Sequence, residues 1–159
     1  MAAVSTSSRR TGVLAWVGLA ARVYLGYVFV DAGLSKLPHP AATEQAVRAY
    51  QLLPWQLAHT YALALPAVEL LIGVLLILGI VTRSAAVAAA LGLCSFLLGI
   101  TSAWVRGLNI DCGCFGGGGT STDPHYLEHV LRDLGWLALA VYLIVVRRTR
   151  LALGDVLFG

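Results

Sequence analysis

Two cysteines separated by one glycine, Cys112-Gly113-Cys114, are the residues of this sequence best suited to chemistry. In an oxidising compartment such a pair could form a redox-active disulfide, a metal site or a structural disulfide. The structural bond is the least favoured, because closing a ring around one residue removes little chain entropy. Bringing the two Cα atoms within ~4.4–6.8 Å bends the backbone sharply, which Gly113 permits because it lacks a Cβ. A strained, exposed disulfide exchanges readily, so the motif favours redox chemistry.

His125 and His129 offer a second chemistry for the same cysteines. Their spacing places both imidazole rings on one face of a helix. With Cys112 and Cys114 they would complete a Cys2His2 set suited to zinc or copper. Metal binding is not favoured over two other interpretations. The histidines could simply lie at a membrane interface, or they could serve thiol activation or a proton relay, since histidine titrates near neutral pH.

Long apolar stretches must hold these residues at a membrane. The chain has 159 residues, of which 58% are hydrophobic and 12% charged, about half the charge of a soluble domain. A bilayer core of ~30 Å takes about 20 apolar residues in a helix. The sequence therefore predicts one all-α membrane domain over residues 1–159, a four-helix bundle, and excludes a soluble globular domain. The expected spans are residues 13–34, 61–81, 85–105 and 126–146.

The basic residues predict how these helices cross the membrane. With both termini in the cytoplasm, the cytoplasmic flanks hold six basic residues (Arg9, Arg10, Arg83, Arg147, Arg148 and Arg150) and the opposite flanks three (Lys36, Arg48 and Arg106). This arrangement follows the positive-inside rule. The loop 106–124, which carries the cysteines, then faces the outside of a bacterial plasma or inner membrane. The first stretch is too long for a signal peptide and lacks a small-residue cleavage site, so we expect it to be retained.

Charged residues inside the expected spans predict a polar core. Arg22 and Glu69 lie near the middle of the first and second spans, where an arginine costs ~2.5–3.5 kcal/mol on insertion scales. Their depths match within about a turn, so we expect them to pair. A second polar cluster is expected nearer the outside, comprising Asp31, Lys36, Arg132 and Asp133. These charges form either a structural ion-pair network or a polar pocket for a quinone head group or a proton path.

Other segments are expected to connect or to pack. The sequence predicts a short helix over residues 41–51, followed by Trp55. This helix is either an outer interfacial helix or a simple connector. Cys94 in the third span is expected to be a small buried packing residue. The basic residues form no stripe and do not alternate with exposed aromatic residues, which excludes nucleic-acid binding.

Several of these positions resemble the DoxX-like membrane proteins and, among them, the MauE family. The resemblance covers roughly residues 14–146. The matching first- and second-span positions are Arg22, Gly26, Phe29, Ala32-Gly33, Lys36-Leu37, Gln51-Leu52-Leu53-Pro54, Pro66, Glu69 and Gly73. The element Cys112-Gly113-Cys114-Phe115-Gly116 and the later Arg132-Asp133 resemble the MauE branch. Where Asp133 stands, an asparagine is the residue associated with the family.

The resemblance implies a four-helix membrane protein associated with extracytoplasmic thiol redox. By it, the functional positions are Cys112 and Cys114, with Arg22, Glu69 and Arg132 as the polar core. The leading hypothesis is a redox-active disulfide that exchanges with an extracytoplasmic thioredoxin-fold or disulfide-forming partner and passes electrons to or from a membrane quinone. Two alternatives remain: a metal-handling membrane protein, and a non-catalytic accessory subunit that scaffolds a larger membrane complex.

Overall fold

The computed structural model describes the backbone of residues 4–111, 113, 119–120 and 125–145. It describes the side chains of the same residues, apart from 4–14, 111, 119 and 120. Within this part of the chain there are five helices and one pair of two-residue strands. The prediction of an all-helical fold is therefore confirmed, except for this short strand pair.

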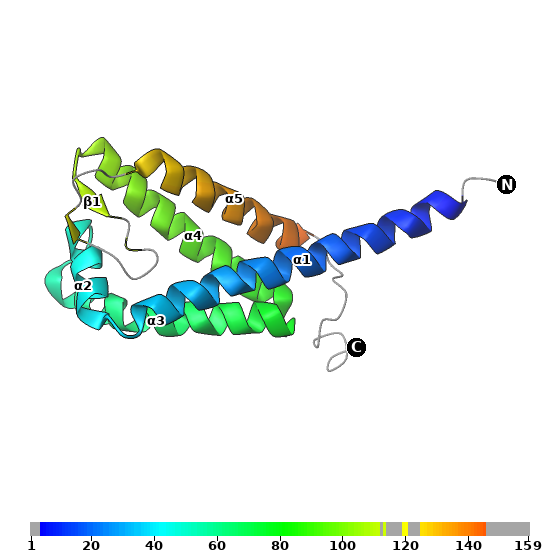
Figure 1. Cartoon of the computed structure of the whole chain (residues 1–159), viewed down its shortest axis with the longest axis horizontal. Coiled ribbons are helices and arrows are strands. Elements are labelled where there is room, and N and C mark those ends of the chain that lie inside the picture. Colours follow the sequence, from blue (N-terminus) through cyan, green and yellow to red (C-terminus); the bar gives the residue numbers. More distant parts are fainter. Residues whose placement is uncertain (1–3, 112, 114–118, 121–124, 146–159) are drawn as a thin grey trace.

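Four long helices lie lengthwise beside one another (Figure 1). They are α1 (Val4–Lys36), α3 (Trp55–Leu78), α4 (Thr82–Val105) and α5 (Tyr126–Val145). The short helix α2 (Pro40–Ala49) lies at the end where α1 and α4 finish and α3 and α5 begin, and we call this the hairpin end. At the opposite end a tight turn joins α3 to α4, and Gly79 closes α3 with a φ of +71°.

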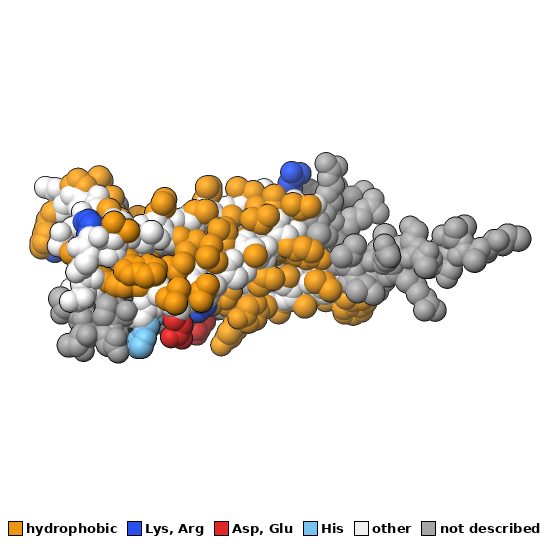
Figure 2. Space-filling model, turned by 90° about the horizontal axis from the view of Figure 1, so that it is seen from above, with side chains coloured by type: hydrophobic (Ala, Val, Ile, Leu, Met, Phe, Trp, Pro, Cys, Tyr) orange, Lys and Arg blue, Asp and Glu red, His pale blue; other side chains and the backbone are white. Residues whose placement is uncertain are grey.

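Three described helices are long and apolar enough to cross a membrane: the part of α1 over Ala15–Lys36, α3 and α4. Helix α3 begins six residues before the expected position 61. The fourth expected span corresponds to α5, which has 20 residues. Hydrophobic side chains cover most of the described surface on the face shown in Figure 2, as expected for helices that contact lipid.

Glycines bring α1 and α3 into backbone contact. A Cβ built on Gly73 would lie 2.7 Å from the carbonyl oxygen of Gly26, and one built on Gly33 would lie 2.9 Å from that of Pro66. Real Cβ atoms do not approach other atoms so closely, so only glycine fits these positions. Lipid chains are as apolar as leucine, so close packing of small residues is one of the forces that can hold membrane helices together.

Alanines and leucines fill the space between the other helices. The core includes Leu25 and Phe29 of α1, Leu76 of α3, Leu93 of α4 and Leu143 of α5, together with the buried Ala85, Ala86, Ala89 and Ala140. These side chains come from all four long helices. The core therefore joins α5 to the three apolar helices.

A polar network fixes α2 against the start of α3. Glu44 accepts hydrogen bonds from both Arg48 and His59, the latter at 2.7 Å. The Arg48 guanidinium also lies over the Trp55 ring, 3.0 Å from its centroid. The expected short helix is confirmed with the bounds Pro40–Ala49.

Candidate functional site

The Cys-Gly-Cys segment lies between two short strands at the hairpin end. Strand β1 (Ile110–Asp111) pairs antiparallel with β2 (Gly119–Thr120). Cys112 and Cys114 lie outside the described residues. Gly113 between them is buried and has a φ of +65°, a conformation that glycine adopts without steric cost.

Tyr126, the first residue of α5, attaches this segment to the helices. Its hydroxyl donates a hydrogen bond to the carbonyl of Leu108 and accepts one from the N–H of Ile110 at 3.2 Å. Its ring stacks on Trp104, with 6.2 Å between the centroids. These contacts hold β1 against the ends of α4 and α5.

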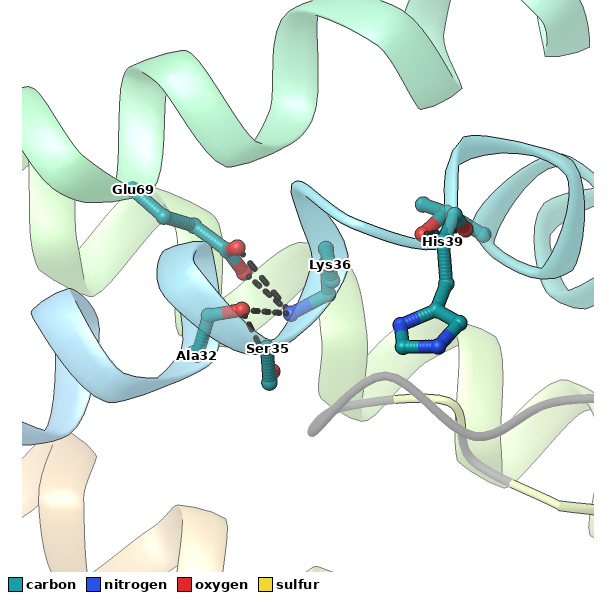
Figure 3. Close-up of polar contacts among 6 residues, drawn as sticks. Ala32, Ser35, Lys36, His39 and Glu69 are labelled. Carbon is teal, nitrogen blue, oxygen red and sulfur yellow. Dashed lines mark hydrogen bonds and ion pairs between the residues drawn. The ribbon is translucent and has the colours of Figure 1, made fainter.

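A buried ion pair joins α1 to α3 below the cysteine segment. The Lys36 ammonium lies 3.0 Å from each carboxylate oxygen of Glu69 and donates a third hydrogen bond to the carbonyl of Ala32 at 3.1 Å (Figure 3). The two side chains are 2% and 3% exposed, so the pair has little access to water. Side chains in helices point towards the helix N-terminus, which explains why Lys36 reaches back one turn to Glu69.

The expected pairing of Arg22 with Glu69 is wrong. Close contacts of Gly33 with Pro66 and of Gly26 with Gly73 set the register of α1 against α3. This register places Glu69 opposite Val30, about 12 Å along the helix from Arg22 at a rise of ~1.5 Å per residue. Arg22 is itself buried in α1, but the structure does not bring it to Glu69.

Arg132 and Asp133 are neighbours on α5 that form an ion pair. Asp133 is 1% exposed, and its carboxylate has no hydrogen-bond partner among the described residues; Nε of Arg132 approaches to 3.6 Å. The Arg132 guanidinium also lies 4.9 Å from the centroid of the Trp136 ring. Asp133 and Glu69 line one small cavity of about 20 Å³. The outer polar cluster is thus formed in part, with Lys36 and Asp133 buried and Asp31 exposed.

A larger cavity of about 230 Å³ opens at the hairpin end between α2, α3 and α4. Its walls are mostly apolar and aromatic, and they include Tyr50, Tyr61 and Phe96. Lys36 lies at one wall and Gly113 at another. The cavity therefore connects the buried ion pair with the backbone between the two cysteines.

The remaining candidate residues are not gathered into one site by the described structure. His125 is exposed and His129 half-buried at the start of α5. Among the described residues no group of three metal-ligating side chains occurs, and the two cysteines of the metal alternative lie outside them. Cys94 is exposed on α4, so the expectation of a buried packing residue is wrong.

The sequence analysis did not predict that Lys36 is the ion-pair partner of Glu69, although the spacing of residues in α1 indicates that Lys36 is buried. Phe29, Ala32, Gly33 and Lys36 follow the i, i+3, i+4, i+7 pattern of one helical face, and all four are buried. A lysine on a buried face requires a partner. This pattern marks Lys36, like Arg22, as a buried cation of α1 that requires a partner.

Comparisons with known proteins agree with this architecture. Residues 14–146 match the family model described as Methylamine utilisation protein MauE. The Methylamine utilization protein MauE of Paracoccus denitrificans is 39% identical over 123 residues, which cover 77% of this chain and 65% of that relative. No solved structure matches the chain. The extent of the family match and this identity show that the chain is a multi-pass membrane protein that belongs to the MauE family.

Proposed function

We propose that this protein is a membrane thiol–disulfide redox protein in which Cys112 and Cys114 cycle between a dithiol and a disulfide. The observation that carries the proposal is the buried, left-handed Gly113 at the wall of the cavity. A single residue between two cysteines makes a small, bent ring, and strained disulfides have higher, more oxidising potentials. Such a bond accepts electrons from another dithiol more readily than a relaxed structural disulfide.

The exchange needs a partner with two thiols, and we propose an extracytoplasmic thioredoxin-fold or disulfide-forming protein. One partner thiolate attacks a sulfur of the Cys112–Cys114 bond, forming a mixed disulfide and releasing one thiolate of this protein. The second partner thiol then displaces the other cysteine, so the partner leaves with a disulfide and Cys112 and Cys114 become a dithiol. Two electrons and two protons pass to this protein in each cycle.

The proposal includes a fourth membrane span and an orientation. Helix α5 presents Leu127, Leu131, Leu134, Val141 and Val145 outward, while its Asp133 faces the protein interior. This division suits a helix in lipid, where ionisable groups face the protein interior. The six-to-three distribution of basic residues then places both termini in the cytoplasm of a bacterial cell and the hairpin end outside.

The relative's name places that protein in methylamine utilisation. We propose a corresponding accessory role for this chain, in which it supplies disulfides to an extracytoplasmic protein of such a system, as part of a larger membrane complex. A thiol-exchange site beside an apolar cavity supports this role better than one of simple scaffolding. A scaffold would require neither a cysteine pair nor a cavity next to it.

Counting thiols in intact cells tests the proposal. The Cys94→Ser variant leaves only Cys112 and Cys114, and a membrane-impermeant maleimide should label no thiol in the oxidised protein and two thiols after incubation with reduced thioredoxin. Replacing both loop cysteines by serine in the same background is the matched control and should abolish labelling. The proposal fails if labelling requires opening the cytoplasm. It also fails if the purified protein holds two free thiols and one metal ion per chain.

A further inference from the structure

We infer that the cavity of about 230 Å³ at the hairpin end holds one acyl chain of an anionic phospholipid, whose phosphate group binds Arg106. The inference goes beyond the proposed function and does not depend on the chemistry of the cysteines. It joins two features of the structure: a mostly apolar cavity between α2, α3 and α4, and an exposed arginine at the end of α4.

Three polar side chains of the cavity wall already have hydrogen bonds within the protein. The Lys36 ammonium is bound to both carboxylate oxygens of Glu69. The hydroxyls of Thr43 and Ser95 each donate to a backbone carbonyl, four and three residues earlier in the chain. Since these groups are satisfied without a ligand, the wall suits a hydrocarbon chain better than a polar molecule.

The cavity is large enough for a substantial part of an acyl chain. A dry cavity of ~150 Å³ is sufficient to hold benzene, with its six carbons, in a protein core. By the same measure, a cavity of about 230 Å³ has room for roughly nine carbons. This is about half of a typical phospholipid chain, so the remainder would stay in the bilayer.

The depth of the cavity matches one leaflet of the bilayer. Arg106 lies just past the end of α4, close to the exposed Trp104, and tryptophan is favoured at membrane interfaces. Gly99 and Ser95 line the cavity, about 10 and 16 Å from Arg106 along α4 at ~1.5 Å per residue. Half of a hydrocarbon core of ~30 Å is about 15 Å. A chain that descends from a phosphate at Arg106 therefore reaches the cavity within its own leaflet.

The arrangement of the helices allows a chain to enter from lipid. Helices α3 and α4 are joined by a tight turn at the opposite end and separate towards the hairpin end (Figure 1). Leu52 and Leu53 line the cavity and are 52% and 41% exposed. Because lipid chains are as apolar as leucine, a chain gains little from the hydrophobic effect when it moves from the bilayer into the cavity. A preference for one lipid must therefore come from its head group.

Arg106 has the donors that a phosphate group requires. Its exposed side chain makes two hydrogen bonds, from Nε to the carbonyl of Ser102 at 3.2 Å and from Nη2 to the carbonyl of Tyr50. A guanidinium has five N–H groups, so three remain for phosphate oxygens. The Tyr50 ring also lines the cavity, 3.5 Å from a Cβ built on Gly99. Tyr50 therefore links the phosphate site to the cavity.

The balance of charges at the hairpin end favours a lipid with a net negative charge. Glu44 pairs with Arg48, and Glu69 pairs with Lys36. Among the described side chains, no carboxylate forms an ion pair with Arg106. One unbalanced basic residue near the membrane surface favours an anionic lipid by about fivefold.

Photo-cross-linking of the full chain in phosphatidylcholine nanodiscs tests the site. The probe is a phosphatidylglycerol with a diazirine in the middle of one acyl chain, added as a minor component, and mass spectrometry locates the labelled peptides. We expect label on the parts of α3 and α4 that line the cavity, around Leu65 and Phe96. A phosphatidylcholine with the same diazirine chain should label these peptides about fivefold less.

The variant Gly99→Leu tests the position of the acyl chain. Its new Cβ would lie 3.5 Å from the Tyr50 ring, an ordinary contact, and the rest of the side chain would occupy the cavity. We expect labelling of the cavity peptides to fall about fivefold or more, the equivalent of ~1 kcal/mol of overpacking. Gly135→Leu is the matched control, because a Cβ there meets nothing within 4 Å, and its labelling should equal that of the wild type.

The variant Arg106→Gln tests the head-group contact. Because the charge is removed, the preference for phosphatidylglycerol should disappear, while both probes still label the cavity peptides. Arg106→Lys keeps the charge and should keep most of the preference, which a purely structural role of the bond to Tyr50 does not predict. Arg83→Gln is the matched control, because Arg83 is exposed at the opposite end of α4, and the preference should remain that of the wild type.

Each part of the inference can be overturned. Label spread evenly over the lipid-facing sides of the helices, or undiminished label in Gly99→Leu, would refute the acyl-chain site. Equal label from the two head groups in the wild type, or a preference that survives in Arg106→Gln, would refute the phosphate contact. None of these results depends on the redox state of the cysteines, so the proposed function stands or falls separately.

Discussion

The α1–α3 pair and the α4–α5 pair each hold a carboxylate inside apolar helices, but the two carboxylates differ in their hydrogen bonding. In the first pair, Glu69 has both oxygens bound to Lys36 at 3.0 Å. In the second, Asp133 is equally buried, yet its oxygens have no hydrogen-bond partner among the described residues. One carboxylate is therefore fully satisfied, while the other is held near Arg132 without a hydrogen bond.

The two helix pairs also differ in how closely their helices approach. Helices α1 and α3 meet through glycines whose backbones touch, so that not even a methyl group could be added at Gly26, Gly33 or Gly73. Helices α4 and α5 pack through alanines and leucines, and Gly135 of α5 faces open space. We conclude that the α1–α3 pair is the rigid frame of the molecule. The α4–α5 pair tolerates more change.

The largest effect should follow from removing one partner of the buried ion pair. Lys36→Met leaves the Glu69 charge buried and unpaired, and we expect the free energy of unfolding to fall by about 3–5 kcal/mol. The double variant Lys36→Met/Glu69→Leu should recover most of this loss, because apolar groups then replace both charges. Reversible unfolding in mixed detergent micelles provides the measurement.

A second mutant cycle provides the control for this pairing. Arg22→Leu and Glu69→Leu should be additive to within about 0.5 kcal/mol, as is usual for residues more than ~7–10 Å apart. A rescue of Arg22→Leu by Glu69→Leu, with none for Lys36→Met, would contradict the register of α1 against α3.

A smaller effect is expected at the glycine contact. In Gly73→Ala the added Cβ would lie 2.7 Å from the backbone oxygen of Gly26 and 2.8 Å from the nitrogen of Val30. Two helices must move apart, so we expect a loss of about 1–3 kcal/mol, as for overpacked cores. Gly135→Ala is the matched control and should stabilise the protein by up to ~1 kcal/mol through helix propensity. Equal effects at the two positions would remove the distinction between the helix pairs.

Much of this architecture could be predicted from the sequence, because span length and hydrophobicity are local properties. The long helices and the short helix before Trp55 follow from residue types alone. The partner of Glu69 does not, because it depends on how far one helix is shifted along another. That shift is set by backbone contacts at glycines. As a result, helix α3 extends past the end of α1, and α2 packs against the extending part.

In the candidate site, too, one part could be predicted from the sequence and another could not. The cysteine pair is visible as a motif, and the family resemblance adds its association with redox chemistry. The cavity beside it is not visible in any one segment. Tyr50 follows α2, Tyr61 lies in α3 and Phe96 lies in α4, and only the packed helices bring them together. Cys94 illustrates a related limit: hydrophobicity places it in a span but does not determine which side of the helix faces lipid.

The smallest effect is expected at Asp133, and it tests the other half of the comparison. Asp133→Asn keeps the shape of the side chain and removes its charge. Because the carboxylate makes no hydrogen bond with the described residues, little favourable interaction is lost, and the cost of burying a charge disappears. Arg132 remains 31% exposed and stays over Trp136, so it is not left buried and alone. We expect unfolding in mixed micelles to change by less than about 1 kcal/mol, whereas Glu69→Gln should cost about 3 kcal/mol or more by stranding Lys36. If Asp133→Asn costs as much as Glu69→Gln, the two carboxylates are equally bound and the contrast between the helix pairs is wrong.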